Sequence, residues 1–142
     1  MSHLSRWFQS LTKQNHSITS CATPEYNCVA WAAWETDRWW WPDDAGSYYW
    51  PSSAPREETL EAFEVAYSTL GYRKCDNRDL EAGSEKIAIF VDASGTPTHA
   101  ARQLPNGRWT SKCGSLEDIE HELEGLMGTP YGEVGMVLKR SL

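Results

Sequence analysis

The sequence lacks the features that would insert the chain into a membrane or send it through the general secretory route. No stretch of its 142 residues approaches the roughly 18 consecutive apolar residues that a membrane-spanning helix needs. The first 20 residues contain no apolar run that could form the core of a signal peptide. We therefore expect a cytoplasmic protein with no membrane partner, which would need a specialised route if it were exported.

Basic residues are also scarce. The chain has 13 Lys and Arg against 20 Asp and Glu, for a formal net charge of −7. Proteins that track the phosphate backbone of nucleic acids depend on clustered Lys and Arg, and so do proteins held on anionic membranes by charge. We therefore expect no nucleic-acid partner.

Motifs for metals and nucleotides are missing as well. The four cysteines, Cys21, Cys28, Cys75 and Cys113, include no C-x-x-C pair, and we expect them to be reduced thiols. A zinc site built from these cysteines and His99 has suitable residue types, but structural zinc sites usually take their ligands in close pairs. The sequence contains neither a Gly-rich phosphate loop nor a nucleophile-elbow serine. We expect no metal and no cofactor.

The first half of the chain has helical character. Its length fits one domain over residues 1–142, in which residues 1–25 have few apolar anchors and form a loosely docked arm. Strong helix formers predict a buried helix that begins at Pro24 or Asn27, with Cys28 in its first turn. Apolar residues at three- and four-residue spacings predict a second helix over 56–70.

The second half alternates short apolar runs with turns, which is typical of strands. The expected strands are residues 86–92, 98–104, 108–112 and 131–139. Asn106-Gly107 predicts a tight hairpin between the second and third of these. We expect a further helix from Ser115, as its cap, to about Leu126. Helices followed by an antiparallel sheet indicate the α+β class.

Tryptophan is the residue present in excess, with eight in the chain. Six large rings gather among prolines and turn formers: Trp39, Trp40, Trp41, Tyr48, Tyr49 and Trp50. Such rings can line a groove that binds sugar faces or peptide side chains, and they can equally anchor a loop across a small domain. We expect most of them to anchor the loop and two or three to form the wall of a cleft that binds substrate. The candidates for that wall are Trp39, Trp40, Trp41, Tyr49 and Trp50.

Cys28 and His99 are the residues best suited to chemistry. A thiol at a helix N-terminus faces unpaired N–H groups and the positive end of the dipole, which favour the nucleophilic thiolate. His99 opens a predicted strand after a turn, where its imidazole can act as a base or as a cation beside the thiolate. Each residue alone has an inert interpretation, as a core cysteine and as a surface strand histidine.

In combination these segments resemble the papain-like cysteine hydrolases, and most closely their NlpC-type cell-wall amidase branch. The resemblance covers about residues 26–112. It rests on Asn27-Cys28-Val29-Ala30-Trp31, on the hairpin from His99 to Trp109, and on a polar residue on the next strand, here Ser111. It implies a papain-like fold with N-terminal helices packed on a small antiparallel sheet. It also implies that Cys28 attacks, His99 moves the proton and Ser111 orients His99.

The third position departs from the pattern of that branch, whose members usually carry His, Asn, Asp or Glu there. Gln103 or Asn106 could take the place of Ser111 if the hairpin register shifts. The chain also looks like an uncharacterised group of bacterial papain-like domains with Asn-Cys-x-x-Trp-Ala, Tyr-Trp-Pro and Trp-Thr-Ser-Lys segments. The matching residues here are 27–32, 49–51 and 109–112.

Two functional hypotheses follow. The first is a cysteine hydrolase of an amide bond in a peptide or peptide-like substrate, in which the backbone N–H of Cys28 helps to bind the oxyanion. Lys112 would lower the thiolate pKa or bind a substrate carboxylate, unless it is a solvated hairpin lysine. The second is a non-catalytic papain-like domain whose aromatic residues contact a partner. A delivery or inhibitor protein is left open as a partner in either case.

Overall fold

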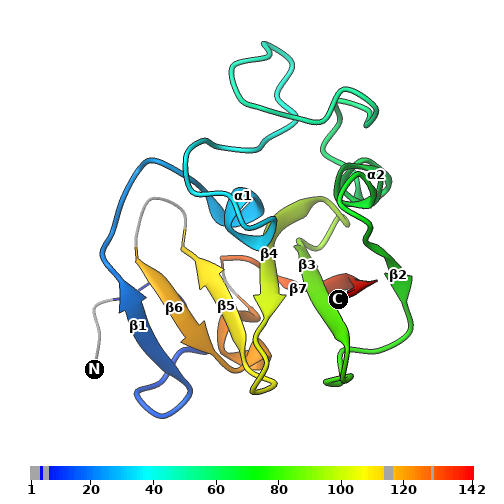
Figure 1. The fold of residues 1–142 in the computed structure, drawn as a ribbon. Helices are drawn as coiled ribbons and strands as arrows, with labels where there is room; N and C mark the ends of the chain where they lie inside the picture. Colours follow the sequence, from blue (N-terminus) through cyan, green and yellow to red (C-terminus); the bar gives the residue numbers. More distant parts are fainter. Residues whose placement is uncertain (1–3, 5–6, 114–116, 129) are drawn as a thin grey trace.

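A single antiparallel sheet dominates the computed structural model, which describes residues 4, 7–113, 117–128 and 130–142 (Figure 1). Its strand order is β1-β6-β5-β4-β3-β7-β2. The strands are β1 (His16–Ser20), β2 (Arg73–Cys75), β3 (Ser84–Val91), β4 (Pro97–Gln103), β5 (Trp109–Lys112), β6 (Asp118–His121) and β7 (Glu133–Ser141). The helices are α1 (Cys28–Ala32), α2 (Leu60–Ser68) and a 3₁₀ turn, η2 (Leu123–Leu126). The structure is mostly β with few helices, which is compatible with the α+β class.

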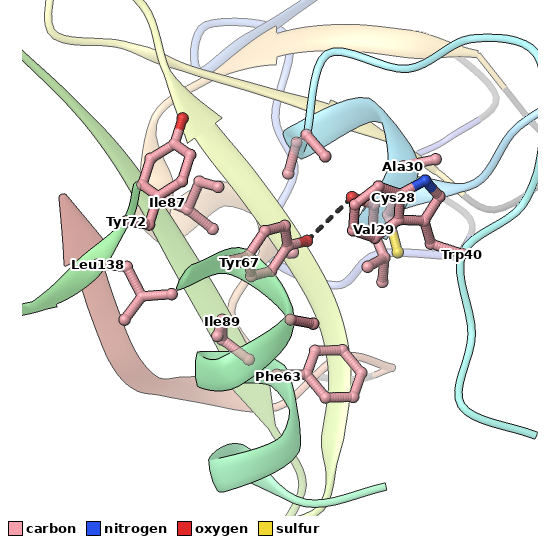
Figure 2. Close-up of a cluster of buried hydrophobic side chains, with 14 of the residues drawn as sticks. Cys28, Val29, Ala30, Trp40, Phe63, Tyr67, Tyr72, Ile87, Ile89 and Leu138 are labelled. Atoms are coloured by element: carbon pink, nitrogen blue, oxygen red, sulfur yellow. Dashed lines mark hydrogen bonds between the residues drawn. The ribbon is translucent and has the colours of Figure 1, made fainter. Parts of the chain in front are cut away.

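The sheet separates two apolar clusters because alternate residues of a strand point to opposite faces. On β3, Ile87 and Ile89 join the first cluster, whereas Ala88 and Phe90 join the second. The first cluster also contains α1 and α2, and the Tyr67 hydroxyl of α2 donates a hydrogen bond of 2.9 Å to the carbonyl of Val29 in α1 (Figure 2). Burial on both faces explains why residues 87–91 of β3 are continuously apolar.

The two helices predicted in the first half of the chain are present but shorter than expected. Helix α1 begins at Cys28 after its cap Asn27, so Cys28 lies in the first turn, as predicted. Helix α2 begins only after Thr59, whose side chain accepts a hydrogen bond from the backbone N–H of Ala62. Residues 56–59 are thus outside the helix, because a Thr cap satisfies the first free N–H groups and sets the starting point.

The predicted helix from Ser115 to Leu126 is wrong. Ser115 itself lies outside the described residues, and the chain beyond it forms β6 and then η2. Strand β6 pairs with β1 on one side and with β5 on the other. The spacing of Ile119 and Leu123 suits a helix, but two neighbouring strands supply the backbone hydrogen bonds instead, and tertiary pairing overrides a weak local preference.

The prediction of a loosely docked N-terminal arm is also wrong for the part of residues 1–25 that the structure describes. Strand β1 forms an edge of the sheet, and Leu4, Phe8 and Leu11 are buried in the second cluster. Four of the five β1 side chains are exposed, so this strand lacks the alternation that reveals strands in a sequence. Across the described ranges, no helix is long and apolar enough to cross a membrane.

Candidate active site

Asn27 fixes the start of α1 and the loop of aromatic residues at the same time. Its Oδ1 accepts hydrogen bonds of 3.1 Å from the backbone N–H groups of Ala30 and Trp40. Its Nδ2 donates a 2.8 Å hydrogen bond to the carbonyl of Trp40. One buried side chain therefore caps the helix that begins with Cys28 and ties residues 39–50, called here the aromatic loop, to that helix end.

Cys28 lies where β4 and β5 separate. These strands pair only at Arg102 with Thr110 and at Gln103 with Trp109, and α1 contacts both of them. Burial raises the pKa of the Cys28 thiol to about 11, although hydrogen bonds from the backbone N–H groups of Ala100 and Val29 oppose that rise. The sulfur is thus a neutral thiol at pH 7, in contrast to the thiolate expected from the sequence.

His99 begins a chain of hydrogen bonds that runs through the sheet. Its Nε2 lies 3.0 Å from Oγ of Ser111, and this Oγ lies 2.7 Å from Nε2 of His121. Nδ1 of His121 is 2.7 Å from the carbonyl of Glu122. The structure therefore brings together His99 and Ser111, as predicted, and adds His121. Gln103 and Asn106 bond to Arg78, Gly107 and Glu120 instead.

The chain of hydrogen bonds determines where the protons lie. A carbonyl only accepts, so Nδ1 of His121 carries a proton and its Nε2 accepts from the Ser111 hydroxyl. Oγ of Ser111 must then accept from Nε2–H of His99. Burial lowers the pKa of His121 to about 4 and that of His99 well below its ordinary value, so both rings are neutral at pH 7. Nδ1 of His99 is consequently unprotonated, which is the form of a base.

Nδ1 of His99 is buried, and it has no hydrogen-bond partner in the described part of the chain. The structure thus does not join Cys28 to His99 by a hydrogen bond. Ala100 packs in the first cluster with α1, whereas His99 meets Phe90 of the second cluster edge to face. Cys28 therefore lies on the face of the sheet that Ala100 points to, and the His99 side chain lies on the opposite face. The Tyr131 ring stacks on the imidazole with centroids 3.9 Å apart.

A pocket of about 340 Å³ opens beside the sulfur of Cys28. Its wall comprises Asn27, Cys28, Trp39, Trp41, Tyr48, Thr98 and Tyr131. Trp39 and Tyr48 stack with ring centroids 5.6 Å apart, so two residues of the aromatic loop contribute a stacked pair to this wall. The same Tyr131 that covers His99 therefore separates the imidazole from the pocket.

The aromatic loop divides between pocket and core, as the sequence suggested. Of the five rings predicted to bind substrate, Trp39 and Trp41 line the pocket. Trp40 and Trp50 are buried against Tyr67 and Phe63 of α2 and do not reach it. Tyr49 is exposed, and the Arg38 guanidinium lies 3.6 Å from its ring centroid.

Arg56 holds the aromatic loop in shape. Its guanidinium donates to the carbonyl of Asp43 at 3.0 Å, to Oδ1 of Asp43 at 2.9 Å and to the carbonyl of Tyr48 at 2.9 Å. The loop is therefore fastened at Asn27 on one side and at Arg56 on the other, which fixes the positions of Trp39 and Tyr48.

Lys112 is buried, so its interpretation as a solvated lysine is wrong. Its ammonium lies 5.3 Å from the centroid of the Tyr26 ring, and Lys112 is not among the residues that line the pocket. Burial lowers the pKa of Lys112, while its positive charge slightly favours the thiolate of Cys28. Of the two roles predicted for Lys112, the structure supports the influence on the thiol.

Sequence reasoning missed His121, Tyr48 and Tyr131. His121 falls within the helix predicted from Ser115 to Leu126, but it is fully buried on β6. Its only signal was the alternation of Asp118 to His121, which competed with helical spacing. In the described ranges, no group of three His, Cys, Asp or Glu side chains could hold a metal ion.

Comparisons with known proteins place the chain in a family without assigning an activity. No curated protein and no solved structure matches it. One family matches residues 17–139, a span that includes Cys28, His99, Ser111 and His121. Since this span is most of the 142 residues, the chain belongs to the family described as Domain of unknown function (DUF7689).

Proposed function

We propose that this protein is a cysteine hydrolase that cleaves an amide bond in a peptide or peptide-like substrate, on a papain-like fold of the NlpC type. The observation that carries the proposal is the unprotonated Nδ1 of His99, which the hydrogen bonds through Ser111 and His121 keep in that state. The next residue of the strand, Ala100, directs its backbone N–H to Cys28. A base with a free lone pair is what a neutral thiol needs.

In the proposed reaction, Nδ1 of His99 takes the proton from Sγ of Cys28 as the sulfur attacks the amide carbonyl carbon. The C–N bond then breaks, and the amine leaves with the proton that His99 held. Water, deprotonated by the same Nδ1, attacks the thioester, which releases the carboxylic acid and returns the proton to Sγ. The backbone N–H of Cys28, at the start of α1, is the donor that we propose for the oxyanion.

The proposal requires a rearrangement when substrate binds. Nδ1 of His99 and Sγ of Cys28 must come within hydrogen-bond reach, and the Tyr131 ring lies on the imidazole. A substrate side chain that fills the aromatic pocket would displace Tyr131, which is part of that wall. The thiol and the imidazole are both neutral beforehand, so the proton moves during attack rather than before it.

The order of the elements supports the papain-like assignment. A cysteine begins α1, a histidine lies near the start of β4, and its polar partner lies on the next strand, β5. Ser111 is a weaker orienting group than the usual amide or carboxylate. His121 offsets this weakness, because it accepts the hydroxyl proton and directs the lone pairs of Oγ toward His99.

A second candidate function is that of a binding domain with no chemistry. The observations in its favour are the raised pKa of Cys28 and the coverage of His99 by Tyr131. The pocket would then hold an apolar side chain of a partner between Trp41 and the stacked pair of Trp39 and Tyr48.

Labelling by a dipeptidyl chloromethyl ketone distinguishes the two functions. This reagent alkylates a thiol through the active-site base, and Cys113 is a matched control because it is equally buried and burial also raises its pKa. For a hydrolase we expect Cys28 to be labelled at least about a hundredfold faster than Cys113, and His99→Ala to remove that advantage. Equal labelling of both cysteines, measured by peptide mass spectrometry, would establish the binding domain instead.

A further inference from the structure

A second, larger pocket lies near the other end of α1. Its volume is about 790 Å³, and its wall includes Trp34, Leu80, Arg102, Leu104, Pro105 and Leu142. Most of these side chains are apolar, and Trp34, Leu80 and Leu142 are exposed. No residue of this wall belongs to the pocket beside Cys28.

Trp34 occupies a position that normally holds glycine. The backbone N–H of Trp34 bonds to the carbonyl of Trp31, and that of Glu35 bonds to the carbonyl of Ala30, which together form a Schellman ending for α1. Trp34 has φ +69°, a conformation that costs a bulky residue about 1 kcal/mol. This strained backbone places the exposed indole of Trp34 in the wall of the pocket. The indole Nε1 donates a hydrogen bond of 3.0 Å to Glu85.

Arg102 supplies an unpaired buried charge to the same wall. Its side chain is 3% exposed, and its buried Nε has no hydrogen-bond partner in the ranges described. The Arg102 guanidinium lies 3.5 Å from the centroid of a Trp34 ring. No ion pair of the described residues includes Arg102. Buried guanidinium groups are ordinarily paired, because an uncompensated charge is costly in an apolar environment.

The acidic residues of the pocket do not neutralise this arginine, because each has a closer cation. Glu81 pairs with Lys86 at 2.9 Å and with Lys139 at 3.1 Å. Glu85 pairs with Arg140 at 3.2 Å. Arg102 therefore forms an ion pair with neither carboxylate of the wall.

We propose that this pocket binds a small monocarboxylate with an apolar body. The carboxylate would pair with the guanidinium of Arg102 under the indole of Trp34, and the apolar body would lie against Leu80, Leu104 and Leu142. Arg is suited to this role because its planar fork can bind both oxygens of a carboxylate. A mostly apolar pocket with a small number of polar groups is the usual form of a small-molecule site. This site does not depend on the proposed hydrolase activity.

Calorimetric titration with decanoate, below its micelle-forming concentration, tests the site. Decan-1-ol has the same apolar chain without the charge. We expect decanoate to bind at least about tenfold more tightly than decan-1-ol, because hydrogen bonds between charged groups contribute more than neutral ones. Equal affinities, or no binding of decanoate, would overturn the proposal. Binding of only a peptide with an apolar C-terminal residue would overturn it too, because the occupant would then be a polypeptide.

Four variants test where the ligand binds. Arg102→Met should remove the preference for decanoate while leaving decan-1-ol binding unchanged, and it should fold because it removes an unpaired buried charge. Trp34→Gly should weaken both ligands without loss of stability. Arg73→Met is the matched control on the exposed strand β2 and should bind as the parent does. Retention of the tenfold preference in Arg102→Met would contradict the proposal. Cys28→Ser should bind decanoate normally even if it has lost all hydrolysis.

Discussion

The two ends of α1 differ in how completely their polar groups are satisfied. At the start, Asn27 uses its amide oxygen and nitrogen in three hydrogen bonds, and the backbone is unstrained. At the end, Trp34 is held at positive φ, and the neighbouring Arg102 has a buried nitrogen without a partner. The first end is built for rigidity beside Cys28. The second holds strain and an unpaired charge, which native structures keep mainly where a ligand binds.

Replacing Asn27 should produce the largest loss of stability, because it removes the three hydrogen bonds that hold the start of α1. Asn27→Ala removes a helix cap and also leaves the buried N–H and carbonyl of Trp40 unpaired, so we expect a loss of about 3 kcal/mol in urea unfolding. Thr59→Ala removes only the cap of α2 and should lose about 1 kcal/mol. Equal losses in the two variants would mean that Asn27 does not fasten the aromatic loop.

Acid should weaken the protein through the buried histidines. Burial lowers the folded pKa of His121 to about 4, with Arg108 and His16 also lowering it, while the unfolded ring titrates near 6.5. The unfolded state therefore binds more protons, and stability present above pH 6.5 is lost as the pH falls toward 4. We expect a loss of about 2 kcal/mol from this residue between pH 7 and pH 5. His121→Gln should show a correspondingly smaller loss in the same urea titrations, and an unchanged slope would contradict the burial of a neutral ring.

A double-mutant cycle tests whether Ser111 and His121 act as one unit. Ser111→Ala and His121→Ala each break the same 2.7 Å hydrogen bond, so their combined loss should fall short of the sum by about 1 kcal/mol. The free energy of unfolding of the two single variants and the double variant gives this difference. Simple additivity would show that the chain of hydrogen bonds from His99 ends at Ser111.

Trp34→Gly should have the smallest effect and the opposite sign to Asn27→Ala. Glycine relieves the strain at φ +69°, which offsets the lost indole contacts, so we expect the free energy of unfolding to be unchanged or raised by up to about 1 kcal/mol. Thermal and urea unfolding measure this directly. A loss of about 2 kcal/mol or more would mean that the ring of Trp34 supports the fold and is not reserved for a ligand.

The sequence was a good guide where local signals were strong. The contact of His99 with Ser111 was implied by the family resemblance. The place of Cys28 in the first turn of α1 and the Asn106-Gly107 hairpin follow from spacing and turn chemistry. These features depend on neighbours in the chain, so the local sequence contains most of the information.

The parts that the sequence did not reveal depend on distant partners. Strands β1 and β6 pair with each other, but β1 lacks alternation and the alternation of β6 competes with helical spacing. The buried position of His121 follows from that pairing. Tyr131 reaches the pocket because its carbonyl accepts a hydrogen bond from the hydroxyl of Thr98, on a strand far away in the sequence. The burial that raises the pKa of Cys28 also comes from residues distant in the sequence. The prediction that this helix-start thiol is a thiolate was therefore wrong.

The central claim is that His99 presents an unprotonated Nδ1 to the site. Nitrogen NMR of the protein labelled with ¹⁵N-histidine measures this directly at pH 7, with assignment by His99→Ala and Ser111→Ala. We predict that Nε2 of His99 carries the proton and Nδ1 carries none, and that Ser111→Ala disturbs this preference. A proton on Nδ1, or a doubly protonated ring, would contradict the account of the site.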